Sequence, residues 1–142
     1  MLVSIVDPAR ILLIEDNPAD VFLIKEALRT HGIEYLLQWL SDGEQAVNHI
    51  ECMNEFSSTP ELILLDLNLP KLDGKEVLAY IRRNPWLTRT PVAVLTSSDS
   101  PHDRLETARL GATCYIRKPP TLDEFLTVGA MIRNLLASTP AA

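Results

Sequence analysis

The sequence predicts an α/β fold in which five parallel strands, in the order 2-1-3-4-5, form a sheet doubly wound by helices. Three apolar runs of four residues, Ile11–Ile14, Leu62–Leu65 and Val92–Leu95, are each followed by polar residues. Uninterrupted apolar runs of this length are typical of parallel strands buried on both faces. Longer segments with helical punctuation separate the runs, and this alternation favours a parallel sheet with right-handed crossovers.

Two weaker strands and five helices complete the predicted order. Tyr35–Leu40 and Thr113–Ile116 are enriched in aromatic and β-branched residues, which favours strands. Capping residues predict where the helices begin. The predicted starts are Asn17 before Pro18, the capping box Ser41-x-x-Glu44, Asp73, Ser100 before Pro101, and the capping box Thr121-x-x-Glu124, which opens one continuous last helix.

Composition limits the classes of function. The 142 residues include 13 basic and 19 acidic side chains, a formal net charge of −6, with no basic run, so direct binding to nucleic acid or an anionic membrane is not expected. No apolar run approaches the length of about 20 residues that a transmembrane helix needs, which excludes one. Cys52 and Cys114 lack metal-site spacing, as expected in a reducing, cytoplasmic compartment. We expect one domain over residues 10–137, short extensions over 1–9 and 138–142, and no output domain.

Polar side chains follow four of the predicted strands at one edge of the sheet. Ligands of such sheets bind beyond the carboxyl ends of the strands where the strand order reverses, here between the first and third strands. Glu15 and Asp16 follow the first strand and Asp66 follows the third. Three adjacent carboxylates repel one another unless a cation lies among them, and hard oxygen ligands suit Mg²⁺. Thr96 and Lys118 follow the last two strands, so the group suits a phosphoryl ligand.

Each of these residues alone has a simpler interpretation. An aspartate after a strand is commonly a helix cap, and a lone lysine is commonly a solvated surface residue. Complementary groups at four strand ends of the same edge would then have to coincide by chance. We therefore interpret them as one functional site.

The order and spacing of these motifs resemble the receiver domains of two-component response regulators, over about residues 10–136. The matching segments are Ile11–Asn17, Leu65–Pro70 with Asp73-Gly74, Leu95–Ser97 and Tyr115–Pro119. The resemblance implies the flavodoxin-like (βα)5 fold of the CheY-like superfamily. Leu67–Pro70 and Asn84–Leu87 are also similar to single-domain regulators that pair with bacterial phytochromes.

The resemblance implies that Asp66 accepts a phosphoryl group from a histidine kinase, which could be of the phytochrome type. It also implies a Mg²⁺ ion held by Glu15, Asp16, Asp66 and the backbone carbonyl of Asn68. Such a protein is a phosphoacceptor in signalling, with enzymatic activity limited to phosphorylating itself from small donors and dephosphorylating itself.

The resemblance further assigns roles to residues beside the acceptor. Lys118 would pair with the phosphoryl oxygens, and Thr96 would move inward to hydrogen-bond one of them. Tyr115 would follow Thr96 as the second switch residue, and the peptide bond before Pro119 would be cis. The signal would leave through residues 101–136, a face that could support a phosphorylation-linked homodimer.

Three other functions are alternatives to the phosphoacceptor. A phosphatase of the haloacid-dehalogenase type would need a carboxyl two residues after the nucleophile, where this chain has Asn68. An FMN carrier would need a phosphate-binding loop after the first strand, but Glu15 and Asp16 would repel a phosphate there. A pseudo-receiver that binds partners without phosphorylation stays open as the alternative.

Overall fold

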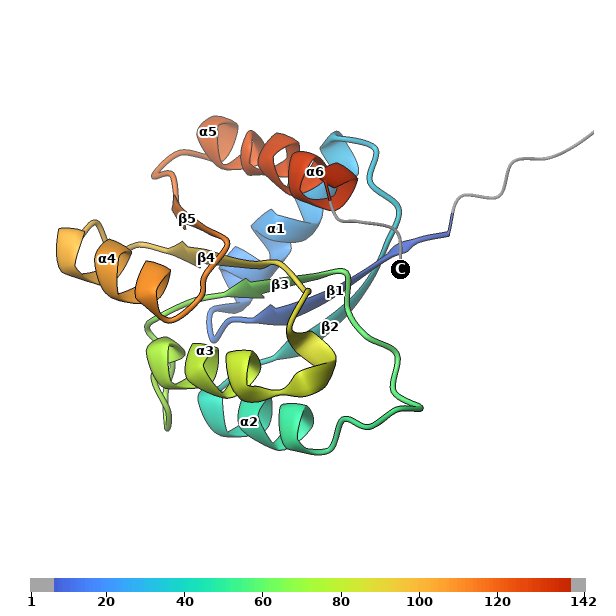
Figure 1. Cartoon of the computed structure of the whole chain (residues 1–142). Coiled ribbons are helices and arrows are strands. Elements are labelled where there is room, and N and C mark those ends of the chain that lie inside the picture. The colour runs from blue at the N-terminus through green and yellow to red at the C-terminus, as the bar shows by residue number, and fades with distance from the viewer. Residues whose placement is uncertain (1–6, 139–142) are drawn as a thin grey trace, which may run out of the picture.

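The computed structural model describes residues 7–138, so parts of both predicted terminal extensions, 1–6 and 139–142, lie outside it. Strands and helices alternate along the described chain (Figure 1). They are β1 (Ala9–Ile14), α1 (Pro18–Thr30), β2 (Tyr35–Leu40), α2 (Gly43–Glu51), β3 (Leu62–Leu65), α3 (Gly74–Arg83), the short 3₁₀ helix η1 (Pro85–Leu87), β4 (Val92–Thr96), α4 (Pro101–Arg109), β5 (Cys114–Arg117), α5 (Leu122–Leu126) and α6 (Val128–Ser138).

The sheet has the predicted order and direction. Its strands run β2-β1-β3-β4-β5, and every neighbouring pair is parallel. Helices α1, α5 and α6 cover one face, while α2 and α3 cover the other (Figure 1). In the register, Ile14 of β1 pairs with Leu40 of β2 and with Leu65 of β3, so these three strands end side by side.

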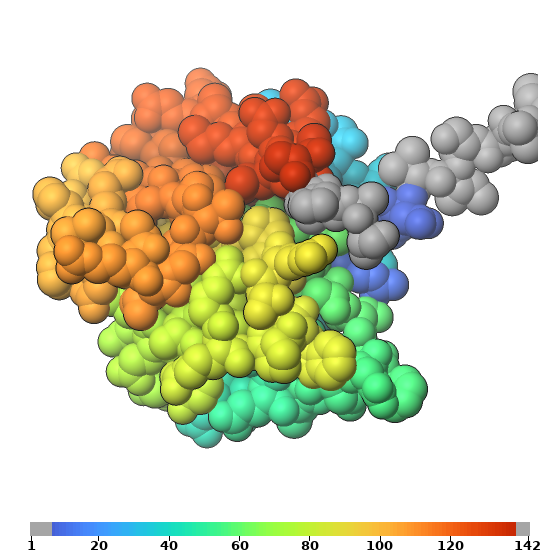
Figure 2. All heavy atoms as spheres, in the orientation of Figure 1, coloured from blue at the N-terminus to red at the C-terminus, as the bar shows by residue number. Residues whose placement is uncertain are grey.

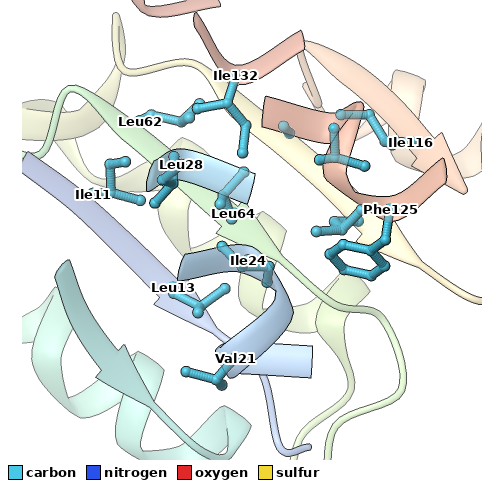
Figure 3. Packing of buried hydrophobic residues seen from close by; sticks show 13 residues of the cluster. Ile11, Leu13, Val21, Ile24, Leu28, Leu62, Leu64, Ile116, Phe125 and Ile132 are labelled. Carbon is cyan, nitrogen blue, oxygen red and sulfur yellow. The ribbon is translucent and has the colours of Figure 1, made fainter. Parts of the chain in front are cut away.

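The core lies on both faces of the sheet because the strand side chains alternate between two apolar layers. Ile11 and Leu13 of β1 join Phe125 and Ile132 in the layer under α1, α5 and α6 (Figure 3). Leu12 and Ile14 of the same strand, with residues of α2 and α3, form the layer on the opposite face. Burying each large aliphatic side chain contributes about 1.5–3 kcal/mol, which explains why the central strands are apolar throughout.

Most predicted helix starts are confirmed by their caps. The Asn17 side chain accepts the N–H of Ala19, and the Asp73 side chain accepts the N–H groups of Lys75 and Glu76. Ser100 and Thr121 likewise accept N–H groups three residues further on. These contacts satisfy backbone donors that have no partner within the helix.

The predicted start of α2 is wrong by one residue. Asp42, not Ser41, is the cap, and its side chain accepts the N–H of Gln45 at 2.8 Å. The Gln45 side chain in turn accepts the N–H of Ser41, the residue before the cap, at 3.1 Å. Tertiary contact sets this start: the N–H of Gly43 donates to the carbonyl of Pro70, and Leu72 backbone lies where a Gly43 side chain would be.

The last helix is also not continuous as predicted. It divides at Thr127, whose hydroxyl and N–H both donate to the carbonyl of Glu124, so that α5 is separate from α6. Gly129 then packs directly on α1, since a Cβ there would lie 2.3 Å from the carbonyl oxygen of Ala27. The break therefore accompanies a close approach between helices that helical periodicity does not reveal.

A search of the described helices finds none with the length and apolar character needed to cross a lipid bilayer.

We expect Gly74→Ala to destabilise the fold more than Gly32→Ala. A Cβ at Gly74 would lie 2.3 Å from the Asp66 carbonyl oxygen and 2.5 Å from the Leu67 Cα, so backbone must shift, at about 3 kcal/mol. A Cβ at Gly32 meets nothing within 4 Å, and its positive φ of 67° costs an alanine about 1 kcal/mol. Urea unfolding of both variants measures the difference, and equal losses would contradict the close packing at Gly74.

Candidate functional site

Three carboxylates meet where β1 and β3 end. Single ligand atoms from Glu15, Asp16 and Asp66 all lie within 4.8 Å of one another. The pairing of β1 with β3 causes this, since the N–H of Asp66 donates to the carbonyl of Ile14 at 3.0 Å. Glu15 and Asp66 are only 1% and 5% exposed, whereas Asp16 is exposed. The site is therefore a buried acidic floor that opens to solvent on one side.

Lys118 supplies a positive charge to this floor. Its Nζ lies 2.8 Å from Glu15 Oε2, 2.8 Å from Asp66 Oδ2 and 2.8 Å from Asp20 Oδ2, and its side chain is 7% exposed. The backbone N–H of Lys118 donates to the carbonyl of Thr96 at 2.7 Å, which ties the chain after β5 to the end of β4. The predicted lysine therefore does reach the predicted carboxylates.

The expected cis peptide bond before Pro119 is wrong. The bond from Lys118 to Pro119 is trans, as are all peptide bonds of residues 7–138. The trans form is the intrinsically preferred one, and the long lysine side chain reaches all three carboxylates from it.

Burial and pairing shift the ionisation of the site. Burial is the main reason that the pKa of Glu15 is raised to about 7, helped by the charge of Asp66 and opposed by the hydrogen bond from Lys118. Burial would lower the pKa of Lys118, but its hydrogen bonds to Asp20, Asp66 and Glu15 outweigh this and raise that pKa above its ordinary value. The ammonium is therefore held charged, and the carboxylates carry excess negative charge.

The donor set fits a divalent cation. Three carboxylates within reach of one point are hard oxygen ligands, and the exposed side leaves room for water, as Mg²⁺ requires. The N–H of Asn68 donates to Asp66 Oδ1 at 3.3 Å, so the Asn68 backbone lies beside the Asp66 carboxylate. Its carbonyl stays a predicted ligand.

The two predicted switch residues both contact Ser98, in the loop that follows β4. Thr96 is fully buried at the end of β4, and its Oγ1 accepts the N–H of Ser98 at 3.4 Å. The hydroxyl of Tyr115 donates to the carbonyl of Ser98 at 2.9 Å, and the Arg104 guanidinium stacks 4.5 Å above the Tyr115 ring. A change at Thr96 would therefore reach Tyr115 through Ser98.

Comparison with known proteins gives the family. A model of the response regulator receiver domain matches residues 11–128. Response regulator Rcp1 of Synechocystis sp. (strain ATCC 27184 / PCC 6803 / Kazusa) is 41% identical over 140 residues, which cover 95% of each chain. The chain belongs to the response regulator receiver domain family. It is thus a signalling domain of two-component systems and not a classical enzyme.

Solved structures agree with the receiver assignment. The phosphorylated cyanobacterial phytochrome response regulator RcpA is 39% identical with a TM-score of 0.84, and 95% of this chain and 98% of that chain are covered. The Mn²⁺-bound form of Rcp1 is 41% identical with a TM-score of 0.82, over 94% and 98% of the two chains. The receiver domain of sensor histidine kinase PA1611 from Pseudomonas aeruginosa PAO1, with magnesium in its active-site cleft, is 30% identical with a TM-score of 0.73, over 93% and 100%.

Sequence reasoning missed two residues at this receiver site. Asp20 is a third partner of Lys118, and the indole N–H of Trp39 donates to the Glu15 carbonyl at 2.6 Å. Asp20 lies in the first turn of the helix that Asn17 caps, directly after the acidic pair, which was an available signal. Trp39 gave no such signal, because its role depends on the pairing of Trp39 with Leu13 between β2 and β1.

A second missed feature links the receiver's α3 to α4. Lys75 Nζ lies 2.7 Å from Asp103 Oδ1 and 2.7 Å from Glu106 Oε2, and Asp103 also accepts the hydroxyl of Ser98. Figure 2 shows the orange α4 region beside the yellow-green α3 region on the surface. These contacts connect the loop after Thr96 to two surface helices.

We expect Lys118→Met to destabilise the metal-free receiver by about 3 kcal/mol, because it leaves buried carboxylates without their counter-charge. Lys71→Met is the matched control, since the Lys71 ammonium is exposed and lies 3.7 Å from Asp42, a pair that contributes about 0.5 kcal/mol. Urea unfolding at pH 8 with EDTA measures both. Similar losses in the two variants would contradict a structural role for the buried ammonium.

Proposed function

We propose that Asp66 accepts a phosphoryl group from a histidine kinase, with Mg²⁺ bound by Glu15, Asp16, Asp66 and the backbone carbonyl of Asn68. The observation that carries this proposal is the contact of Lys118 Nζ with Asp66 Oδ2, 2.8 Å apart, at the edge of an acidic cluster that suits a divalent cation. A carboxylate beside both an ammonium and a metal site is suited to attack a phosphoryl group.

The transfer is a displacement at phosphorus. One oxygen of Asp66 forms a bond to phosphorus while the bond from phosphorus to the kinase histidine nitrogen breaks. That nitrogen keeps the electron pair and takes up a proton. Bound Mg²⁺ supplies charge neutralisation for the phosphoryl oxygens. Lys118 neutralises the charge of another phosphoryl oxygen. Thr96 Oγ1 gives up its hydrogen bond from the N–H of Ser98, and the Thr96 hydroxyl then donates to the phosphoryl group.

The signal then leaves through Thr96 and Tyr115. When Thr96 turns inward, Ser98 loses its contact with Thr96 Oγ1, and Ser98 also holds the Tyr115 hydroxyl and Asp103 of α4. A shift of this loop therefore reaches the face formed by α4, β5, α5 and α6. The proposed output is a changed surface for a partner, which is how a two-state element responds to a ligand.

The kinase partner proposed here is of the phytochrome type. The support is likeness along nearly the whole chain to RcpA, which is a phytochrome response regulator. Receiver domains of this family interact with histidine kinases in general, and the narrower partner is a proposal.

A phosphorylation-independent pseudo-receiver is the alternative. The contacts of Lys118 with Asp66 and Glu15, and the position of Thr96 at the end of β4, favour the phosphoacceptor.

Acetyl phosphate with Mg²⁺ should phosphorylate the protein on Asp66. Intact mass spectrometry should show an added mass of about 80 Da, the mass of a transferred PO₃ group, as expected for a covalent carboxylate adduct. The adduct should be absent from Asp66→Asn protein and from samples with EDTA. No adduct in protein shown separately to bind Mg²⁺ would favour the pseudo-receiver, and an adduct retained by Asp66→Asn would place the acceptor elsewhere.

We also propose that phosphorylation promotes a homodimer through the face that changes. Leu105 of α4, Leu122 of α5 and Met131 of α6 are exposed large apolar side chains of this region. Sedimentation should show a larger mass for phosphorylated protein, and Met131→Glu should prevent this gain without preventing phosphorylation. Phe22→Glu, at an exposed position on α1, is the matched control. Identical masses with and without phosphorylation would exclude the dimer switch.

A further inference from the structure

One of the carboxylates that contact the Lys118 ammonium lies outside the acidic cluster of Glu15, Asp16 and Asp66. An ammonium has three N–H donors, and the three carboxylates of Glu15, Asp20 and Asp66 each lie 2.8 Å from Nζ. Glu15 and Asp66 belong, with Asp16, to the group whose ligand atoms could hold an ion. Asp20 is not in that group, although it is as close to the ammonium as the other two.

A metal ion and Lys118 would share two carboxylates, those of Glu15 and Asp66. Glu15 Oε2 and Asp66 Oδ2 are the atoms in contact with Nζ, and the same carboxylates are the candidate metal ligands. A divalent cation and an ammonium beside the same carboxylates repel one another, and the repulsion is strong because the site is buried. This repulsion favours a shift of Lys118 toward Asp20, the partner outside the cluster, when the metal binds.

Asp20 is placed to receive the displaced ammonium. It lies in the first turn of α1, whose backbone is anchored by the Asn17 cap. Its side chain is 20% exposed, against 1% and 5% for Glu15 and Asp66. Rearrangement around Asp20 therefore costs less desolvation than rearrangement on the buried floor.

We propose that Asp20 is a positioning residue for Lys118. It retains the ammonium at the edge of the site when a divalent cation occupies the cluster, so that Lys118 stays beside Asp66 and ready for a phosphoryl group. This inference rests on the proposed metal-dependent phosphoacceptor function. It assigns Asp20 an effect on metal affinity that acts through Lys118 and not by contact with the metal.

The test is a double-mutant cycle on Mg²⁺ affinity in the full chain. The variants are Asp20→Asn, Lys118→Met and the double variant, and all carry Trp86→Phe so that fluorescence reports on Trp39, which is bonded to the Glu15 carbonyl. Asp123→Asn is the matched control, since it removes the same charge from the first turn of α5. Thermal unfolding with EDTA checks that each variant folds.

We expect Asp20→Asn to raise the Kd for Mg²⁺ about tenfold, an effect of the size seen when residues around a metal site are removed, because Lys118 then stays on the carboxylates that would hold the ion. Asp123→Asn should leave the Kd within about twofold, because an exposed charge is screened. With Lys118→Met present, Asp20→Asn should change the Kd no more than Asp123→Asn does. An equal rise with and without Lys118 would overturn the inference and make Asp20 a metal-contacting or purely electrostatic residue.

Asp20→Glu keeps the test decisive if Lys118→Met does not fold. The longer carboxylate can still accept the ammonium, so its Kd should lie within about threefold of the unsubstituted value, a loss of well under 1 kcal/mol. A Kd as high as that of Asp20→Asn would contradict the role of the charge. If the protein with Asp20 intact does not bind Mg²⁺, the proposed function itself fails. If that protein binds Mg²⁺ and Asp20→Asn leaves the Kd unchanged, only the role of Asp20 is refuted.

Discussion

The arrangement of the site depends on the attraction between the buried ammonium of Lys118 and the carboxylates around it. Lys118 contacts Glu15, Asp20 and Asp66, and Asp16 completes the acidic cluster. Burial is the main reason that the pKa of Glu15 is raised to about 7, and the charge of Asp66 adds to this effect although Lys118 opposes it. A cluster of carboxylates with a single ammonium suits a divalent cation, which the proposed function requires.

Strand register brings these charges together. β1 and β3 are neighbours in the sheet, with Ile14 paired to Leu65, so the residues that follow them meet at one edge. Apolar layers on both faces hold the strands in this register, since a shift by one residue would move buried side chains to the wrong face. Gly74 adds a backbone contact directly behind Asp66. The precision of the site thus depends on the packing of the sheet.

A chain of hydrogen bonds connects the site to the surface. Ser98 contacts Thr96, Tyr115 and Asp103 at once, and Asp103 is paired with Lys75 of α3. The rotation of Thr96 in the proposed function would therefore act on a loop that contacts α4 and, through Asp103, Lys75 of α3. Such a loop suits a two-state switch, because a ligand shifts a protein only when it favours one state over another.

The sequence by itself determined the strands, their order and most of the site. Apolar runs identify buried parallel strands, and their carboxyl ends necessarily share an edge, which is enough to bring Glu15, Asp16, Asp66 and Lys118 together. Only the tertiary structure decided the cap at Asp42, the break at Thr127, the trans bond before Pro119 and the contact of Lys118 with Asp20, 98 residues apart. These features depend on which distant atoms approach one another, and local propensity and periodicity carry no information about that.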